Sequence, residues 1–253
     1  MKRQTTVLMI SMLIISLTAL PQKKFDAGIT AGTGFADFRG LDAEYLANDI
    51  SNVLSETLEV DFPIEPSGRN FTITAGAFVT YNVLPWLGIR GAVEYVPKGM
   101  VYSGEYYIST SINMESEILK YNSIFKLTYL EFPVSLQLST RSKKKSRDVY
   151  FFLNMGVAPA LNLSAKLDMT LSLVEQEFNN SGLVSNVLES ENDVEDLEGI
   201  ESTDLGLLLS AGVVFNSIAL DIKLTNGRRS IFENPEEGYI RNNAINVAVW
   251  FLF

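Results

Sequence analysis

The chain has 253 residues, a formal net charge of −10 and a hydrophobic fraction of 47%, and its length suits one domain. It contains no cysteine and no histidine, which excludes disulfides, thiolate metal sites, a lipid-modified cysteine and any mechanism that needs an imidazole. The acidic balance argues against a nucleic-acid partner, because phosphate binding needs a basic surface.

The N-terminus has the form of a secretory signal peptide. Lys2 and Arg3 precede the short apolar run Val7–Leu17, as a charged n-region precedes an h-region. We therefore expect residues 1–22 to be a signal peptide and residues 23–253 to form the mature domain. An uncleaved anchor helix is the alternative, but the run is shorter than the about 20 residues that a membrane span needs.

Eight later segments alternate apolar and polar residues with a period of two, which is typical of the strands of a transmembrane β-barrel. The predicted strands are Phe25–Phe35, Phe71–Tyr81, Trp86–Lys98, Ile124–Ser139, Val149–Ala165, Asp204–Phe215, Ile218–Thr225 and Asn243–Phe253. Their less apolar face is rich in Gly, Ala, Ser and Asn. Such residues suit a narrow barrel interior better than the surface of a soluble sandwich.

The connections between these strands alternate strictly between short and long. The short ones are residues 82–85, 140–148 and 216–217, and the long ones are 36–70, 99–123, 166–203 and 226–240. This rhythm is typical of periplasmic turns and extracellular loops. The predicted fold is therefore all-β, an eight-stranded antiparallel up-and-down transmembrane β-barrel with long extracellular loops and both termini on the periplasmic side.

Two features refine the expected barrel. Apolar residues at helical spacing over Asp42–Leu58 predict a short helix that packs on the barrel rim or offers a surface to a partner. Aromatic residues gather near strand ends, which predicts girdles at the two membrane interfaces. The predicted girdle residues are Phe25, Tyr81, Trp86, Tyr150, Phe151, Phe215, Trp250, Phe251 and Phe253 at the short-turn rim, and Phe35, Phe71, Tyr95, Tyr102, Tyr129 and Tyr239 at the other.

Charged residues on the predicted inner faces form a candidate network in the lumen. They are Arg90, Glu94 and Lys98 on the third strand, Glu131 on the fourth, and Asp221 and Lys223 on the seventh. One interpretation is a gate or solute path. The other, which we favour, is structural ion pairing, because the interior of an eight-stranded barrel is just wide enough for side chains.

Two charged runs lie between the predicted strands. The acidic run Glu189–Glu201 suits Ca²⁺ by its oxygen content, but its spacing does not match an EF-hand, and a solvated loop is the favoured interpretation. We predict no metal and no cofactor. The basic run Arg141–Arg147 could meet anionic lipid or a periplasmic partner, although a solvated turn is favoured.

Short motifs spread over the mature chain resemble the PorT-like family of outer-membrane β-barrel proteins of Gram-negative bacteria. They are Lys23–Gly32, Gly91–Gly99, Tyr129–Val134, Asn154–Pro159, Asp204–Gly212 and the aromatic C-terminus. The resemblance implies an eight-stranded barrel in the bacterial outer membrane. It implies little about activity, although some members are linked to protein secretion. Lys223 and Leu224 stand where the family usually has Arg-Tyr.

The last strand ends on Phe253, and a soluble protein seldom exposes such an apolar edge. Pairing with the first strand would close a barrel there. Phe251 and Phe253 also resemble the C-terminal signal that the outer-membrane assembly machinery reads. The expected partners are that machinery, outer-membrane lipid and lipopolysaccharide, and a protein that the sequence does not identify.

Three classes of function remain from the sequence. The favoured one is a non-enzymatic, structural or accessory outer-membrane protein that acts through its extracellular loops or a protein partner. The alternative is a narrow small-solute channel or ligand-binding barrel, which the predicted strand number disfavours. A barrel enzyme is the least favoured, because the usual general base, histidine, is missing.

Overall fold

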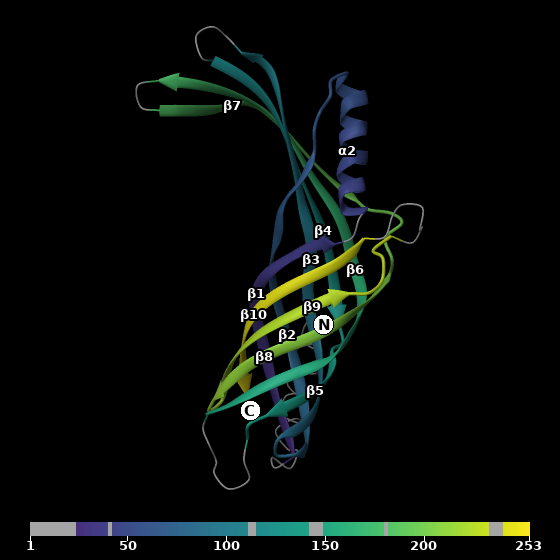
Figure 1. Ribbon diagram of the computed structural model, residues 1–253, viewed down its shortest axis with the longest axis vertical. Coiled ribbons are helices and arrows are strands. Elements are labelled where there is room, and N and C mark those ends of the chain that lie inside the picture. Colours follow the sequence, from purple (N-terminus) through teal and green to yellow (C-terminus); the bar gives the residue numbers. More distant parts are fainter. Residues whose placement is uncertain (1–23, 40–41, 111–114, 142–148, 180–181, 233–239) are drawn as a thin grey trace, which may run out of the picture.

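The computed structural model describes residues 24–39, 42–110, 115–141, 149–179, 182–232 and 240–253. Ten strands in these ranges form one antiparallel sheet, with one helix beside it (Figure 1). The elements are β1 (Phe25–Arg39), α2 (Asp42–Leu58), β2 (Glu65–Leu84), β3 (Leu87–Thr110), β4 (Glu115–Glu131), β5 (Val134–Ser139), β6 (Val149–Asn179), β7 (Gly182–Asp196), β8 (Thr203–Phe215), β9 (Ile218–Gly227) and β10 (Arg241–Leu252).

The sheet closes into a ring of eight strands, which confirms the predicted fold class. β4 and β5 act as one strand of this ring, since both pair with β3 on one side and β6 on the other. The interruption between them falls at Phe132 and Pro133, where proline has no N–H for the ladder. The cyclic order is β1, β2, β3, β4–β5, β6, β8, β9 and β10.

The C-terminal strand closes the barrel against the first strand. β10 pairs with β1 in register from Gly28–Leu252 to Arg39–Arg241. The backbone N–H of Phe253 donates to the carbonyl oxygen of Ala27 at 2.9 Å. The apolar strand that ends the sequence therefore has no open edge.

The distribution of side chains is that of a membrane barrel, apolar outside and polar inside. Outward-facing Phe151 and Ile222 are 63% and 51% exposed, whereas inward-facing Glu131 and Asn154 are 0% and 2% exposed. The same alternation runs along β9, where every second residue from Ala219 is buried. A soluble sandwich would show the opposite distribution.

Three ring strands continue far beyond the barrel, which corrects the sequence prediction of loops. Residues 99–123 are largely the extended hairpin of β3 and β4, and residues 166–203 contain the outer half of β6 and all of β7. The outer parts of β3, β4 and β6, with β7, form a protruding sheet above the barrel (Figure 1). The first long connection also contributes strand, because β2 begins at Glu65.

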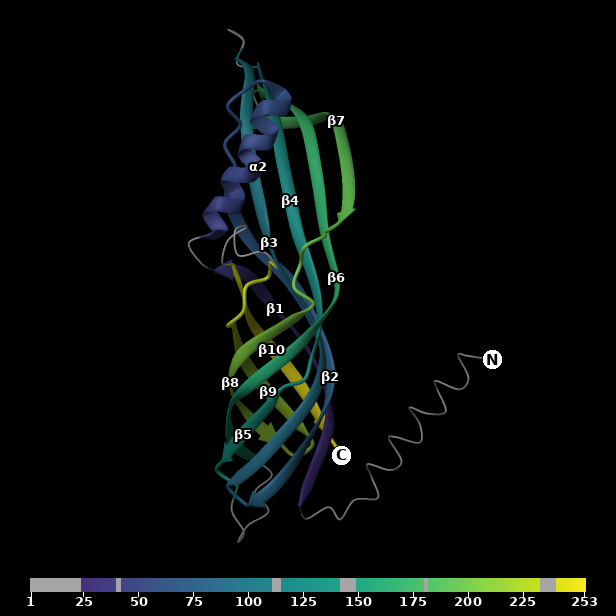
Figure 2. The same ribbon diagram turned by 90° about the vertical axis from the view of Figure 1, so that its right-hand side faces the viewer.

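The predicted helix is present with the predicted bounds, Asp42–Leu58. It stands beside the protruding sheet rather than across the barrel mouth (Figure 2). Its Ser51 hydroxyl donates to the carbonyl oxygen of Phe62 at 2.5 Å, and its Ser55 hydroxyl accepts from the N–H of Phe62 at 2.9 Å. In the described ranges no helix is long and apolar enough to cross a membrane.

Candidate functional site

The predicted charged residues converge in the middle of the barrel. The ammonium group of Lys98 lies 2.9 Å from a carboxylate oxygen of Glu131 and 3.4 Å from one of Asp204. Lys223 forms an ion pair with Glu94 and lies 4.0 Å from the other oxygen of Glu131. Glu131 thus joins two ammonium groups from opposite parts of the ring, and these groups link four strands.

Arg90 lies below this layer and meets aromatic rings. Its guanidinium carbon is 3.5 Å from the centroid of the Trp250 ring and 3.8 Å from that of Phe78. Phe152 stacks on Trp250 with centroids 4.5 Å apart. Cation–π contact of this kind compensates a buried cation for part of its lost hydration. The aromatic layer fills the half of the lumen near the short turns.

A second apolar layer closes the end of the barrel from which the protruding sheet extends. Tyr102 and Phe62 are both 0% exposed, and Tyr102 meets Phe125 edge to face at 5.5 Å. Phe38 packs on the same ring at 5.9 Å.

These three layers leave little free space in the lumen. The two cavities beside Glu94, Asp221 and Lys223 measure about 10 and 20 Å³, which is room for about one water each. At the level of Glu94, Asp221 and Lys223, these two cavities therefore leave no room for a solute larger than water. This geometry favours the structural interpretation of the charges over a gate.

Two residues that complete the interior, Asp204 and Asn242, were not among the charged residues predicted for the lumen. Asp204 pairs with Lys98, and Asn242 donates to the Tyr129 hydroxyl at 3.1 Å and to Asp204 at 3.4 Å. Asp204 shares the parity of inward-facing Gly206 and Ser210, so the alternation of β8 could have identified it. Asn242 comes before the predicted start of the last strand and offered no such pattern.

The prediction of aromatic girdles was wrong for four residues, because they face the interior. They are Tyr102, Tyr129, Tyr150 and Trp250, all less than 9% exposed. Other predicted residues do face outward near the rims, among them Trp86, Phe151 and Phe215 at the short turns and Phe35, Phe71 and Tyr95 at the far rim. Phe251 and Phe253 are also outward and exposed. Tyr239 lies outside the described residues.

The acidic run is strand rather than loop over much of its length. Glu189 to Asp196 belong to β7, which pairs only with β6 among the described elements. The part of the chain that the structure describes holds no group of three or more acidic side chains placed to bind a metal ion. Of the basic run, Arg141 alone is described, and it forms an ion pair with Asp26 at 2.8 Å.

A closed β-sheet with an apolar outer surface and a filled polar interior defines an integral membrane β-barrel protein. The family model described as outer membrane protein beta-barrel domain matches residues 20–233, and the chain belongs to that family. The protein therefore lies in the bacterial outer membrane. The match does not distinguish PorT-like proteins within this class.

Comparison with curated proteins returns no match. Among solved structures, Ail, the attachment invasion locus protein of Yersinia pestis, is 9% identical, alone and in complex with the heparin analogue sucrose octasulfate. The alignment covers 91% of this chain and 99% of that one, with a TM-score of 0.31. The translocator domain of autotransporter NalP from Neisseria meningitidis is also 9% identical, over 99% of this chain and 98% of that one, with a TM-score of 0.24.

Proposed function

We propose that this protein is a non-enzymatic accessory protein of the outer membrane, in which the barrel is an anchor and the protruding sheet is the binding part. The observation that carries the proposal is the contrast between the two halves. The lumen is filled by ion pairs and aromatic rings, whereas strand continues well beyond the membrane-spanning ring. A solute channel would instead need an open lumen.

β7 lies at the edge of the protruding sheet (Figure 2). Its Val187, Leu188 and Val194 are 64%, 52% and 57% exposed. Only its β6 side is paired among the described strands, so the other side can accept a strand from a second protein. Its alternate residues Glu189, Glu191, Asp193 and Glu195 are acidic. The chemistry therefore favours a protein partner with basic residues in an extended segment.

The opposite side of the protrusion is already occupied. Leu46, Ile50 and Leu54 of α2 join the buried cluster that contains Phe62 and Tyr102. Gly104 of β3 lies under the segment after the helix, where a Cβ atom would be 2.1 Å from the carbonyl oxygen of Pro63. Since that side is covered, the free surface of β7 is the better candidate for binding.

Site-specific photo-cross-linking in intact cells tests this proposal. A photoreactive amino acid at Val187 or at Val194 is expected to give one and the same protein adduct, because both positions lie on exposed β7. Leu136 is the matched control, since it is 53% exposed on the barrel wall and should meet lipid. A lack of protein adducts from both β7 positions, or the same adduct from Leu136, would contradict the proposal.

Three finer assignments accompany this proposal. The quoted motifs support a PorT-like protein of a Gram-negative bacterium that is exported by a signal peptide at residues 1–22, which lie outside the described residues. The exposed Phe251 on the closing strand and the exposed Phe253 directly after it support a role as the signal for the outer-membrane assembly machinery. We assign no catalytic residue, and the missing histidine supports a role without chemistry.

A further inference from the structure

Five arginines form a belt at the extracellular rim of the barrel; four of them are exposed and Arg241 is half-buried. They are Arg39, Arg69, Arg228, Arg229 and Arg241, from the ends of β1, β2, β9 and β10. The chain has only nine arginines and is acidic as a whole. More than half of its guanidinium groups are thus gathered on one side of one rim, which the accessory role does not explain.

The belt lies directly above the apolar outer surface. One row of paired outward residues reads Leu224, Ile245, Phe35 and Phe71 across four strands, all between 39% and 58% exposed. The next paired row above it reads Asn226, Asn243 and Asp37. Two residues along a strand advance by about 6.6 Å, so the surface changes from apolar to charged over one row. The guanidinium groups therefore lie at the level of the lipid headgroups.

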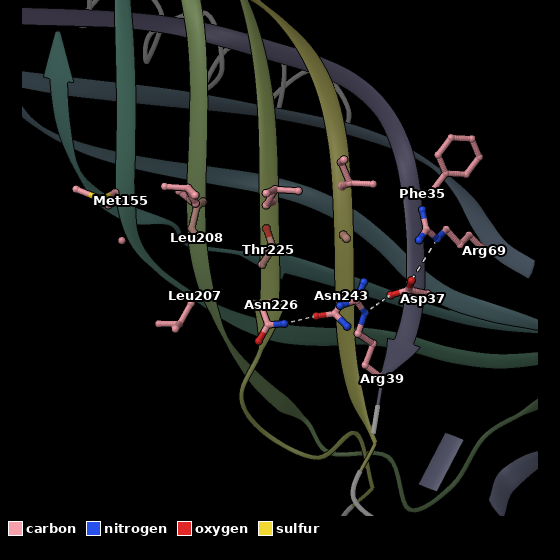
Figure 3. A pocket seen from close by; sticks show the side chains of 15 residues that line it. Phe35, Asp37, Arg39, Arg69, Met155, Leu207, Leu208, Thr225, Asn226 and Asn243 are labelled. Carbon is pink, nitrogen blue, oxygen red and sulfur yellow. Dashed lines mark hydrogen bonds and ion pairs between the residues drawn. The ribbon is translucent and has the colours of Figure 1, made fainter. Parts of the chain in front are cut away.

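The positive charges of the belt favour the binding of an anion. Arg39 and Arg241 are direct partners in the β1–β10 register, so their side chains leave the sheet at neighbouring points of the rim. Asp37 lies between Arg39 and Arg69, 3.7 Å and 3.3 Å from their Nε atoms (Figure 3). Among the described residues, the printed ion pairs of these two guanidinium groups share this one carboxylate, which carries half of their summed charge. Both arginine side chains stay more than half exposed, at 66% and 57%.

The outer wall is hollowed below the belt. One hollow of about 610 Å³ has Asp37, Arg39 and Arg69 at one end (Figure 3). Its outward apolar lining is Phe35, Met155, Leu207, Leu209, Leu224 and Ile245. A second hollow of about 480 Å³, on the other side of β8, combines Leu161 and Leu205 with Arg229. Both hollows thus join an apolar floor to a guanidinium group.

From this geometry we infer that the belt binds the phosphate groups of an outer-leaflet glycolipid, lipopolysaccharide, whose acyl chains lie in the two hollows. Arginine suits this role because its planar fork donates two hydrogen bonds to one phosphate. The inference extends beyond the accessory role, and it stands whether or not β7 binds a protein.

Binding of lipopolysaccharide to the full-length protein in phosphatidylcholine nanodiscs tests the inference. The double variant Arg39→Gln/Arg69→Gln should bind about 10- to 100-fold more weakly, because it loses two charge-assisted contacts. Lys166→Gln is the matched control, since Lys166 is an exposed cation on the outer face of β6, 49% exposed and paired with Asp196 at 3.7 Å. The control variant should bind like the unmodified protein.

Two further binding experiments use the unmodified protein and identify which chemical group of the lipid is recognised. Lipopolysaccharide stripped of its phosphates should bind the unmodified protein as weakly as intact lipopolysaccharide binds the double variant. Inorganic phosphate at millimolar concentration should not displace the intact lipid. Equal binding of the stripped lipid, an equal loss in Lys166→Gln, or full displacement by inorganic phosphate would each overturn the inference.

Discussion

Replacing Glu131 by glutamine is expected to lower the free energy of unfolding by about 3–5 kcal/mol, the usual cost of removing one partner from a buried ion pair. Glu131 is 0% exposed and lies 2.9 Å from Lys98 and 4.0 Å from Lys223. Glutamine keeps the shape but removes the charge that both ammonium groups face. Unfolding by urea in lipid vesicles, followed by tryptophan fluorescence, measures the change.

The matched control is the same substitution in an exposed ion pair. Glu105 and Lys120 lie 2.7 Å apart on the protruding sheet, with side chains 48% and 36% exposed. Water already screens this pair, so Glu105→Gln should cost no more than about 1 kcal/mol. Equal losses in Glu131→Gln and Glu105→Gln would show that the interior charges do not hold the barrel together.

The second large effect is expected at Gly99, where β3 leaves the barrel. Its φ is +144°, and a Cβ atom would lie 1.7 Å from the carbonyl oxygen of Phe125. Gly99→Ala therefore combines backbone strain with a clash against a neighbouring strand. Each contribution is about 1–3 kcal/mol, so the same urea titration should show a loss of about 2–6 kcal/mol.

Gly91→Ala is the control for this substitution, because Gly91 lies on the same strand and a Cβ atom there would meet nothing within 4 Å. It should change the free energy of unfolding by less than about 0.5 kcal/mol, as for an ordinary surface position. If Gly99→Ala is as mild as Gly91→Ala, the strands are not held in the described register at the base of the protrusion.

Period-two alternation predicted the barrel strands but not their continuation into the protruding sheet. Within the membrane the apolar residues of β3 face outward, as Val93 and Tyr95 do. Above Lys98 the pattern inverts, because Met100 and Tyr102 turn their apolar side chains inward to the cluster beneath α2. A search for one continuous apolar face therefore ends at Lys98, although the strand continues to Thr110.

The sequence predicted most of the charged residues that lie in the interior, but it did not predict which of them contact each other. The parity of Arg90, Glu94 and Lys98 places all three inside, yet it does not show which residues meet across the lumen. Lys223 and Glu94 are 129 positions apart in the chain and are brought together by the curvature of the closed sheet. The contact between Arg90 and Trp250 depends on that curvature in the same way.

The arginine belt was also outside the reach of sequence patterns. Its members come from both ends of the chain, and only the β1–β10 register places Arg39 opposite Arg241. Taken singly, each is a charged residue near a strand end. They become neighbours only because the sheet closes into a barrel.

We propose that the barrel is a filled anchor and that the protein acts through its parts outside the membrane. Single-channel recording of the purified protein in planar bilayers tests it most directly, with a wide porin as the positive control for insertion. Because the interior cavities hold about one water each, we expect no stable unitary current from this protein under conditions in which the porin conducts. Reproducible unitary currents from the pure, folded protein would contradict the account.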